Sequence, residues 1–389
     1  MSVSPPYPAF VASRLMLILA GYVCLTLFPA HPVESWQGQA FLGNNWIDGW
    51  VRWDSMWYEA IVDSHPRFLP AYLSSANFFP FYAWVSWLVS LPLRALLNAE
   101  SAFYIAGLLV SSGAFLLGLI AVYRLATTLA GKDVAARTIW LITLFPFSFF
   151  LTAVYADALY FCFAAWCLYF AYAKRWRVAC VLAACAAMTR IPGFALFPAL
   201  VLEYLRQNDF KVASLRRELP SLAILAVAPM VLAAYFFWRY GDPVAFLHAR
   251  QEGWKRAGGL AAFQRDFDYF FAGSIFAYRN VADWLREFEP TRTMLGYWYL
   301  SLLPASVALT FYAARTLGVG LAAWALGSVV MSLPNGLDGV GRFTSVLFPV
   351  FIALAMVLRN RAAFVAVCAV FVPFLLLFFT QFARWRMVL

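Results

Sequence analysis

The sequence has 389 residues, of which 64% are apolar and only 12% are charged. A soluble domain carries about 25% charged residues, and a soluble chain of the present composition would expose enough apolar surface to aggregate. These proportions exclude a soluble globular enzyme, a disordered chain and a disulfide scaffold. They indicate a polytopic membrane protein.

The net charge of +10 indicates membrane orientation rather than a nucleic-acid partner. The basic residues fall mostly in short gaps between apolar runs, where Lys and Arg mark the cytoplasmic side. All six cysteines lie inside apolar runs without the spacing of a metal site, so we interpret them as packing residues among the membrane lipids. No linker divides the sequence, which predicts a single integral membrane domain over residues 1–389.

Eleven apolar runs are candidates for membrane helices, because a span needs about 20 apolar residues. They are residues 11–29, 103–127, 136–151, 153–173, 177–190, 193–205, 220–240, 297–313, 317–333, 342–358 and 362–382. The first run has only Arg14 ahead of its core and no small-residue cleavage site, so we interpret it as a retained helix rather than a signal peptide. Several runs are short, and we expect an all-α fold with about nine to twelve helices that cross or enter the bilayer.

The short basic gaps predict the orientation of these helices. We place in the cytoplasm Lys132 and Arg137; Lys174, Arg175 and Arg177; Arg206, Lys211, Arg216 and Arg217; and Arg359 and Arg361. Two long outer loops follow from this assignment, residues 30–102 and 241–296. For the alternation to work, residues 78–97, which contain Pro80 and Pro92, must lie in the membrane interface or re-enter it rather than cross.

Tryptophans in the first outer loop share one helical stripe. If residues 45–63 form a helix, the spacing i, i+4, i+7, i+11 is followed by Trp46, Trp50, Trp53 and Trp57. Tryptophan favours the lipid headgroup region, so the stripe predicts an interfacial helix along the outer membrane surface. The opposite face of that helix would be solvated, and it carries Asp48, Arg52, Glu59 and Asp63.

Asp54 is the exception, because on such a helix it projects at about 80° from Trp46, on the apolar flank. A carboxylate near hydrocarbon costs about 2.5–3.5 kcal/mol on insertion scales and usually serves a function. One interpretation is that Gly49 breaks the helix and that Asp54 only caps the segment beginning at Ser55. The other is that the carboxylate faces a lipid-linked substrate at the membrane edge.

Short motifs recur in order near the apolar runs. They are RWDSMWY at 52–58, NFFPFY at 77–82, YADALY at 155–160, MTRIPG at 188–193, GDPVAF at 241–246 with Gln251 and Trp254, and GRF at 341–343 with LFP at 347–349. This series resembles the motifs of the PIG-V-type mannosyltransferases, a family that includes the second mannosyltransferase of GPI-anchor assembly and its bacterial relatives. The family usually has Glu at the position of Asp157, which is shorter by one methylene group but keeps the charge. It more often has a polar residue where this sequence has Ile191 and Pro192, so a different acceptor preference is expected.

The resemblance implies a GT-C-type glycosyltransferase. Such an enzyme moves a hexose, here mannose by family analogy, from a polyprenyl-phosphate donor to a hydroxyl acceptor with inversion; a glycolipid, a polymer and a protein all fit as acceptor. Transfer needs a base for the hydroxyl proton and a cation for the departing phosphate. We assign Asp54 as the general base and Arg190 and Arg342 to the donor phosphate. The implied substrate-binding residues are Arg52, Trp53, Trp57, Tyr58, Asp157, Gln251 and Trp254.

Both arginines adjoin interruptions of apolar runs. Arg190 precedes the break at Pro192, and Arg342 follows a Gly-rich turn. An arginine at the membrane edge marks a functional site, and the alternative is that both side chains simply reach lipid headgroups. Asp157 is a third embedded charge, whose alternative role is an ion pair with one of these arginines.

No resident cofactor is expected. Asp266 and Asp268 form a D-x-D pattern that could bind a divalent cation, but their loop is charge-balanced, which favours an ordinary solvated surface. The histidines at 31, 65 and 248 are isolated, so neither a His metal site nor a Ser-His-Asp triad is supported.

A transporter or flippase of a lipid-linked or small polar solute is the alternative function. Transporters show paired broken helices near mid-membrane, whereas the break near Pro192 has no partner in the other half. Embedded charges should converge near the outer surface in a transferase and near mid-bilayer in a transporter. The sequence contains no N-x-Ser/Thr sequon and no ER-retrieval signal, which favours a bacterial plasma (inner) membrane with an extracytoplasmic active site.

The topology predicts the position of a reporter fused after residue 100. Alkaline phosphatase fused there should be active, because residues 78–97 do not cross the bilayer, whereas a fusion after residue 175 should be inactive. Phosphatase assays on whole cells check both fusions. A cytoplasmic reporter at residue 100 would show that residues 78–97 cross.

Overall fold

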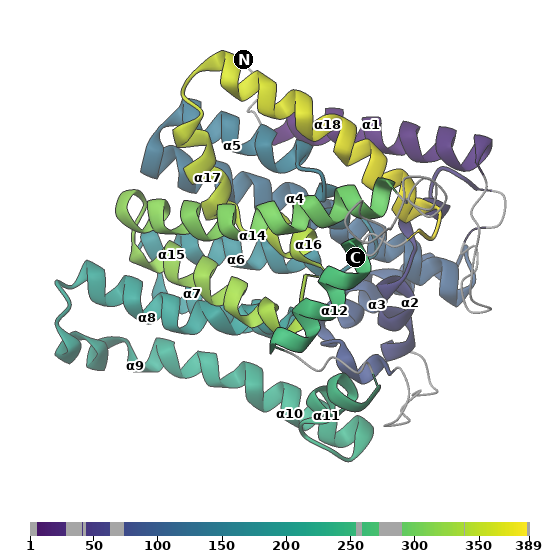
Figure 1. The fold of residues 1–389 in the computed structure, drawn as a ribbon. Helices are drawn as coiled ribbons and strands as arrows, with labels where there is room; N and C mark the ends of the chain where they lie inside the picture. Colours follow the sequence, from purple (N-terminus) through teal and green to yellow (C-terminus); the bar gives the residue numbers. More distant parts are fainter. Residues whose placement is uncertain are drawn as a thin grey trace.

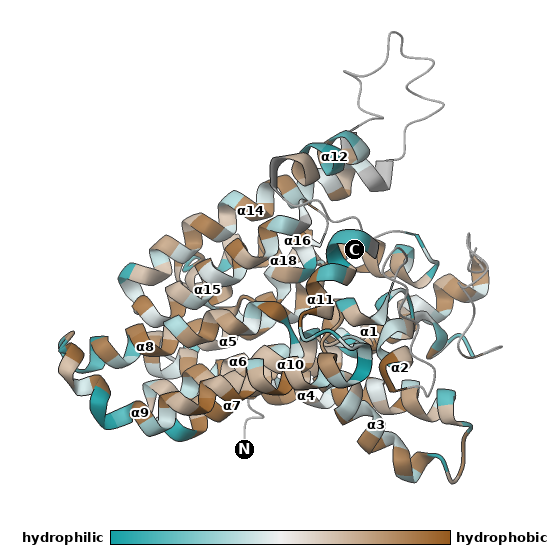
Figure 2. Cartoon of the chain, turned by 90° about the horizontal axis from the view of Figure 1, so that it is seen from below, coloured by the Kyte–Doolittle hydropathy of each residue, from teal (hydrophilic) through white to brown (hydrophobic). Residues whose placement is uncertain are grey.

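The computed structural model describes residues 6–28, 41, 44–62, 74–253, 259–271, 290–337 and 339–386. Within these residues every regular element is a helix, which confirms the predicted all-α fold (Figure 1). The apolar colours of Figure 2 cover most of the helices, and hydrophilic colours gather at turns such as the one before α9.

The helices fall into two halves of the chain. The first half contains α1 (Pro6–Leu27), η1 (Asp48–Trp50), α2 (Asp54–Val62), η2 (Ser75–Asn77), α3 (Phe81–Leu93), α4 (Ala99–Ala130), α5 (Lys132–Leu144), η3 (Ser148–Leu151), α6 (Asp157–Tyr172), α7 (Trp176–Thr189), η4 (Ile191–Ala195) and α8 (Leu196–Gln207). The second half contains η5 (Val212–Ser214), α9 (Leu215–Ala223), η6 (Ile224–Ala226), α10 (Val227–Tyr240), α11 (Ala245–His248), the π-helix η7 (Ala249–Gly253), α12 (Gly259–Phe271), α14 (Pro290–Thr316), α15 (Val319–Ser332), η8 (Leu333–Asn335), α16 (Val340–Ser345), α17 (Phe348–Val357) and α18 (Arg361–Ala383).

Among the described residues each of the eleven predicted apolar runs is mostly helical, although the runs 136–151 and 342–358 are interrupted at residues 145–147 and 346–347. Five described helices are long and apolar enough to cross a membrane: Pro6–Leu27, Ala99–Ala130, Val212–Tyr240, Thr293–Thr316 and Arg361–Ala383. Five shorter apolar helices accompany them: Phe81–Leu93, Asp157–Tyr172, Trp176–Thr189, Val319–Ser332 and Phe348–Val357.

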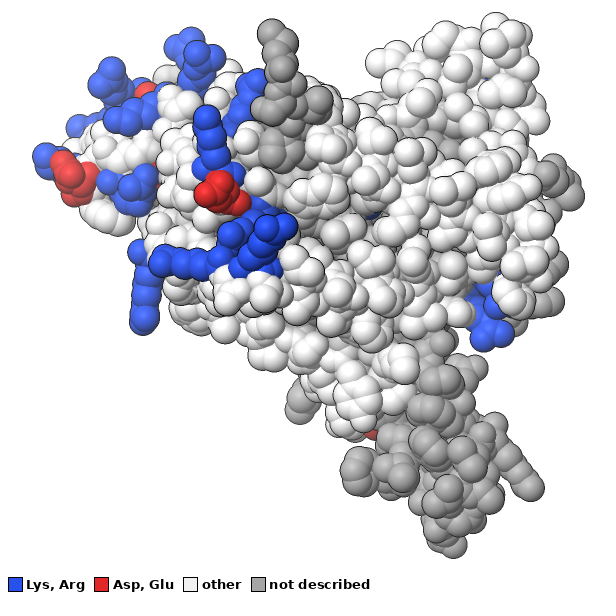
Figure 3. Space-filling model, turned by 90° about the horizontal axis from the view of Figure 1, so that it is seen from above, with Lys and Arg blue, Asp and Glu red and all other residues white. Residues whose placement is uncertain are grey.

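The helices pack side by side with their axes roughly aligned. Helices α1 and α18 lie together along one edge, α9 and α10 lie against α7 along the other, and α4 and α6 pack closely in the interior (Figure 1). Hydrogen bonds tie the turns at one end: Tyr172 donates to the Leu317 carbonyl and Gln207 donates to the Ala171 carbonyl. We call this end, which carries Lys174 and Arg175 between α6 and α7, the basic end; Figure 3 shows Lys and Arg gathered at one end of the molecule.

A buried arginine fixes the connection between α5 and α6. The Arg14 guanidinium, inside α1, donates to the carbonyls of Thr143 and Ser148 at 3.0 Å each and to the hydroxyls of Ser148 and Thr152. Non-helical backbone at membrane depth needs such partners, because lipid offers none. Arg14 therefore stabilises the interruption that precedes α6.

The single helix predicted for residues 45–63 is wrong. The chain forms η1, changes direction at Val51–Trp53, where Trp53 has φ +50°, and starts α2 at Asp54. The predicted solvated face is also wrong for two of its members, because Asp48 and Arg52 are buried and form an ion pair of 2.5 Å. Burying that pair against the end of α18 requires the bend.

The four tryptophans of the predicted stripe consequently have different environments. Trp50 is buried against Phe379 of α18, whereas Trp46 is exposed and stacks on Tyr22 of α1 at 3.9 Å between ring centroids.

Residues 78–97 contain the 13-residue helix α3, about 20 Å long, which is shorter than the roughly 30 Å hydrocarbon core of a bilayer. Its position relative to the membrane stays a prediction.

Gly193 allows η4 to approach α7 closely. A Cβ atom at Gly193 would lie 2.4 Å from backbone atoms of Ala186 and Ala187, which cannot move aside without distorting α7. Gly193→Ala should lower the free energy of unfolding by about 2–3 kcal/mol, measured by denaturant unfolding in detergent. Gly113→Ala is the matched control, because a Cβ there meets nothing within 4 Å; equal losses in both variants would contradict the close approach.

Candidate active site

Four charged side chains from distant parts of the chain meet in one cluster. Each comes from a helix end or a short helix: Asp54 begins α2, Asp157 begins α6, Arg190 directly follows α7, and Arg342 lies in the six-residue helix α16. We call Asp54, Asp157, Arg190 and Arg342 the charge cluster. Helix ends bring polar groups together where the chain reverses between apolar segments.

Arg342 bridges the two acids of the charge cluster. Its Nη1 donates to Asp54 Oδ2 at 2.5 Å, and its Nε donates to Asp157 Oδ2 at 2.8 Å. Arg190 Nη1 donates to the other oxygen of Asp157. The Asp157 side chain is fully buried, whereas that of Asp54 is 14% exposed, so Asp54 is the carboxylate that can be reached from outside.

Aromatic rings surround the arginines. The Arg342 guanidinium carbon lies 4.4 Å from the ring centre of Tyr155 and 5.5 Å from that of Phe150, and that of Arg190 lies 5.2 Å from Phe343. Such cation–π contacts stabilise a charge where water is scarce. The Tyr155 hydroxyl also accepts from the Asp54 backbone N–H at 3.3 Å, which ties the start of α2 to the segment before α6.

The structure separates Arg52 from the charge cluster. Its guanidinium is fully buried and bonds to the Asp48 carboxylate and to the carbonyls of Asp48, Val51 and Ala383, at 2.5–2.8 Å. These contacts fix the bend before Asp54 to the end of α18. Arg52 therefore holds the backbone that leads into Asp54 and does not contact the charge cluster.

Three aromatic residues of the first motif also contact protein groups. Trp53 packs edge-on against Trp385, and Trp57 stacks parallel to Phe78 at 6.3 Å. Tyr58 is buried between Phe78 and Tyr82. Burial raises the pKa of its phenol, an effect that the nearby Arg342 charge opposes.

Two further residues were predicted to bind substrate. Gln251 is exposed in η7 and makes no hydrogen bond to the charge cluster, and Trp254 lies outside the described residues. The two acids of the D-x-D pattern have separate partners on α12: Asp266 pairs with Arg265 and Asp268 accepts from Gln264. Among the described residues no three His, Cys, Asp or Glu side chains gather as a metal site.

Sequence reasoning missed two residues. Tyr155 lies inside a motif that was recognised, two positions before Asp157, but only the fold shows its hydroxyl against α2. Arg14 was considered only as a flanking charge, although an arginine within an apolar run is itself a signal of a buried polar role.

The charge cluster lies at the end of α6 and α7 opposite the basic end. Asp157 and Arg190 flank the two helices on one side, and Lys174 and Arg175 lie in the turn on the other. The 16 residues of α6 separate these ends by about 24 Å, which is most of the roughly 30 Å thickness of the hydrocarbon core. The embedded charges thus converge at one end of the helices rather than at their middle.

The fold is that of GT-C-type membrane glycosyltransferases, and the chain is an integral membrane protein. ArnT from Cupriavidus metallidurans, in a crystal structure bound to undecaprenyl phosphate, is similar with a TM-score of 0.52 and 17% identity over 92% of this chain and 61% of that one. The Archaeoglobus fulgidus oligosaccharyltransferase, in complex with Zn and sulfate, is similar with a TM-score of 0.51 and 15% identity over 96% of this chain and 53% of that one. The chain thus spans less than two thirds of either protein.

The family model for mannosyltransferase (PIG-V) matches residues 31–246, which is more than half of the chain. No curated protein matches the sequence. The chain belongs to the PIG-V mannosyltransferase family, as its motifs predict.

Asp157 should matter for stability as well as for any reaction. Asp157→Asn leaves two largely buried guanidinium groups against a neutral amide, which should lower the free energy of unfolding by about 3 kcal/mol. Denaturant unfolding in detergent measures the change. The control is Asp209→Asn, which removes an exposed pair with Lys211 and should change stability by less than about 0.5 kcal/mol. Similar values for the two variants would contradict a structural role for Asp157.

Proposed function

We propose that this protein transfers mannose from a polyprenyl-phosphate donor to a hydroxyl acceptor with inversion, with Asp54 as the general base. The observation that carries the proposal is the charge cluster, in which a reachable carboxylate adjoins two arginines at one end of the helices. Family membership supports the sugar and the reaction class. The lipid carrier is supported by ArnT, whose crystal structure contains undecaprenyl phosphate.

The location of the charge cluster supports an extracytoplasmic reaction. Lys and Arg are concentrated on the cytoplasmic side of membrane proteins, and the charge cluster lies opposite the basic end. The reacting carbon of a polyprenyl-linked sugar must remain at the membrane interface, because the prenyl chain stays in the bilayer. This arrangement favours a transferase over a transporter, whose binding site lies near mid-bilayer.

In the proposed step, transfer of the acceptor's hydroxyl proton to Asp54 accompanies departure of the donor phosphate. The acceptor oxygen attacks the anomeric carbon, its proton passes to an Asp54 oxygen, and the bond from that carbon to the donor phosphate breaks with its electron pair on the phosphate. The phosphate gains a second negative charge as it leaves. Arg342 and Arg190 stabilise that charge as cationic hydrogen-bond donors, and Asp157 holds the two guanidinium groups in place.

The ion pair between Asp54 and Arg342 sets a condition for this step. Arg342 donates to the Asp54 carboxylate at 2.5 Å, so in this arrangement it occupies the oxygen that would accept the hydroxyl proton. A donor phosphate that binds Arg342 competes directly with Asp54. We infer that donor binding releases the base, so that the acceptor is activated only when the donor is present.

Asp54→Asn tests the base and its pairing together. The substitution should lower kcat by about 10²–10⁴-fold, the usual contribution of general base catalysis, in a membrane assay with polyprenyl-phosphate mannose. Affinity for the donor should be unchanged or higher, because Arg342 no longer shares its charge with a carboxylate. Glu59→Gln on the same helix is the control and should retain transfer. Full transfer by Asp54→Asn would remove Asp54 from the mechanism.

A further inference from the structure

Two tryptophans near the charge cluster have left-handed backbone conformations. Trp53, directly before Asp54, has φ +50°, and Trp385, in the turn after α18, has φ +63°. This conformation brings Cβ close to the following carbonyl oxygen, so a residue other than glycine adopts it only where surrounding contacts hold it. The contacts of each tryptophan therefore identify what holds the bend before Asp54.

The two tryptophans contact each other. Their ring centres are 5.4 Å apart and their planes meet at 65°, an edge-to-face geometry that aromatic pairs favour. Trp385 is buried, and its ring centre also lies 5.1 Å from the guanidinium carbon of Arg52. The turn after α18 thus contacts both residues that lead into Asp54.

Backbone hydrogen bonds hold Trp385 at the end of α18. Its N–H donates to the Phe382 carbonyl at 3.1 Å, and the Ala383 carbonyl, two residues earlier, accepts from Arg52 Nε at 2.8 Å. Helix α18 itself packs against α1 and α5. The turn is therefore fixed to a packed helix on one side and to the bend before Asp54 on the other.

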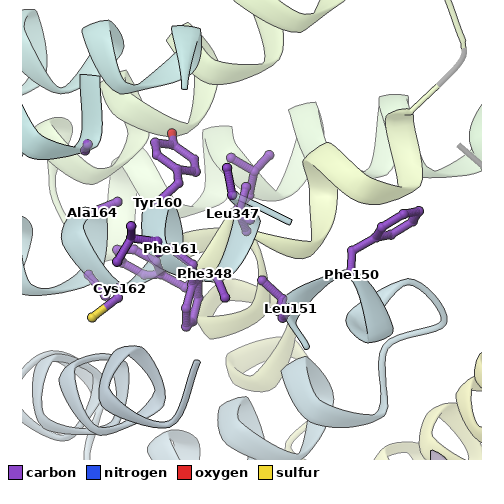
Figure 4. Packing of buried hydrophobic residues seen from close by; sticks show 14 of the residues in the cluster. Phe150, Leu151, Tyr160, Phe161, Cys162, Ala164, Leu347 and Phe348 are labelled. Carbon is purple, nitrogen blue, oxygen red and sulfur yellow. The ribbon is translucent and has the colours of Figure 1, made fainter. Parts of the chain in front are cut away.

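The same end of α18 supports the rings beside Arg342. The Phe382 ring centre lies 5.5 Å from that of Phe150 and 5.9 Å from that of Tyr155, and these two rings flank the Arg342 guanidinium. Figure 4 shows the Phe150 ring pointing away from the packed side chains of α6. The end of α18 therefore contacts the surroundings of both members of the ion pair between Arg342 and Asp54.

We infer that Trp385 is a positioning residue for Asp54. The inference rests on the proposed function and concerns a residue outside the range 31–246 that the family model matches. A change of φ at Trp53 rotates the chain that follows it, so the left-handed conformation there decides where the Asp54 carboxylate lies. Trp385 stabilises that conformation by packing against Trp53 and Arg52. A misplacement of about 1 Å at a reacting group can cost about 10²-fold in rate.

Glycine and alanine at position 53 test the backbone part of the inference. Both substitutions remove the indole ring with all of its contacts, and they differ from each other only in Cβ. Glycine adopts positive φ readily, so kcat of Trp53→Gly should exceed that of Trp53→Ala by about fivefold or more, the ratio that corresponds to the left-handed penalty. Transfer assays with polyprenyl-phosphate mannose measure both values. Equal values, or a lower value for glycine, would overturn the inference.

Trp385→Leu tests the contribution of the ring. It should lower kcat by about tenfold or more and leave the KM for the donor little changed, and Trp385→Phe, which keeps an aromatic edge, should recover most of the loss. In an Asp54→Asn background Trp385→Leu should cause less than about threefold further loss, because a positioning residue acts only through the group that it positions. Trp176→Leu is the matched control, since Trp176 is a buried, edge-stacked tryptophan at the basic end, and it should change kcat little.

The double variant separates this inference from the proposed function. Normal kcat in Trp385→Leu would overturn the inference and leave the proposed function intact. Losses that multiply in the double variant would show that Trp385 acts independently of Asp54 and would overturn the inference as well. Full transfer by Asp54→Asn alone would instead contradict the proposed function. If Trp385→Leu does not fold, the comparison of glycine and alanine at position 53 decides, because both of those variants keep Trp385.

Discussion

The structure depends on an alternating chain of opposite charges held at the edge of an apolar bundle. Asp54, Arg342, Asp157 and Arg190 follow one another so that each inner member contacts two opposite charges. In a medium of low dielectric constant, any one of these groups alone would be very costly to bury. Each is therefore tolerable only because the others are present, which makes the cluster a stability element as well as the proposed reactive site.

Interruptions of helices create the place for that cluster. Residues between α5 and α6, the break after α7 and the Gly-rich turn before α16 all expose backbone groups that lipid cannot satisfy. Arg14 solves this problem before α6 by donating to the carbonyls of Thr143 and Ser148. Arg52 does the same at the bend before α2, where it donates to the nearby Asp48 carbonyl and to the distant Ala383 carbonyl. Two arginines thus support the scaffold, while two others carry the charge that the proposed donor needs.

The sequence was informative about elements with a strong local signal. Apolar runs located the helices, because a segment in lipid must satisfy its backbone internally and be apolar on its surface. The embedded charges at 54, 157, 190 and 342 were also recognisable, because charge within apolar sequence is rare and costly. The helix proposed for residues 45–63 failed because a periodic tryptophan pattern was read without the buried pair between Asp48 and Arg52.

By itself, the sequence determined the membrane environment, the helical class, the family and the identity of the charged residues. Only the tertiary structure decided which charges meet, since Asp54 and Arg342 are 288 positions apart and no local pattern encodes their pairing. It also decided that Arg52 supports the bend before Asp54 and that Tyr155 holds the start of α2. Helix formation depends on hydrogen bonds between residues four apart, whereas ion pairing depends on how whole helices pack.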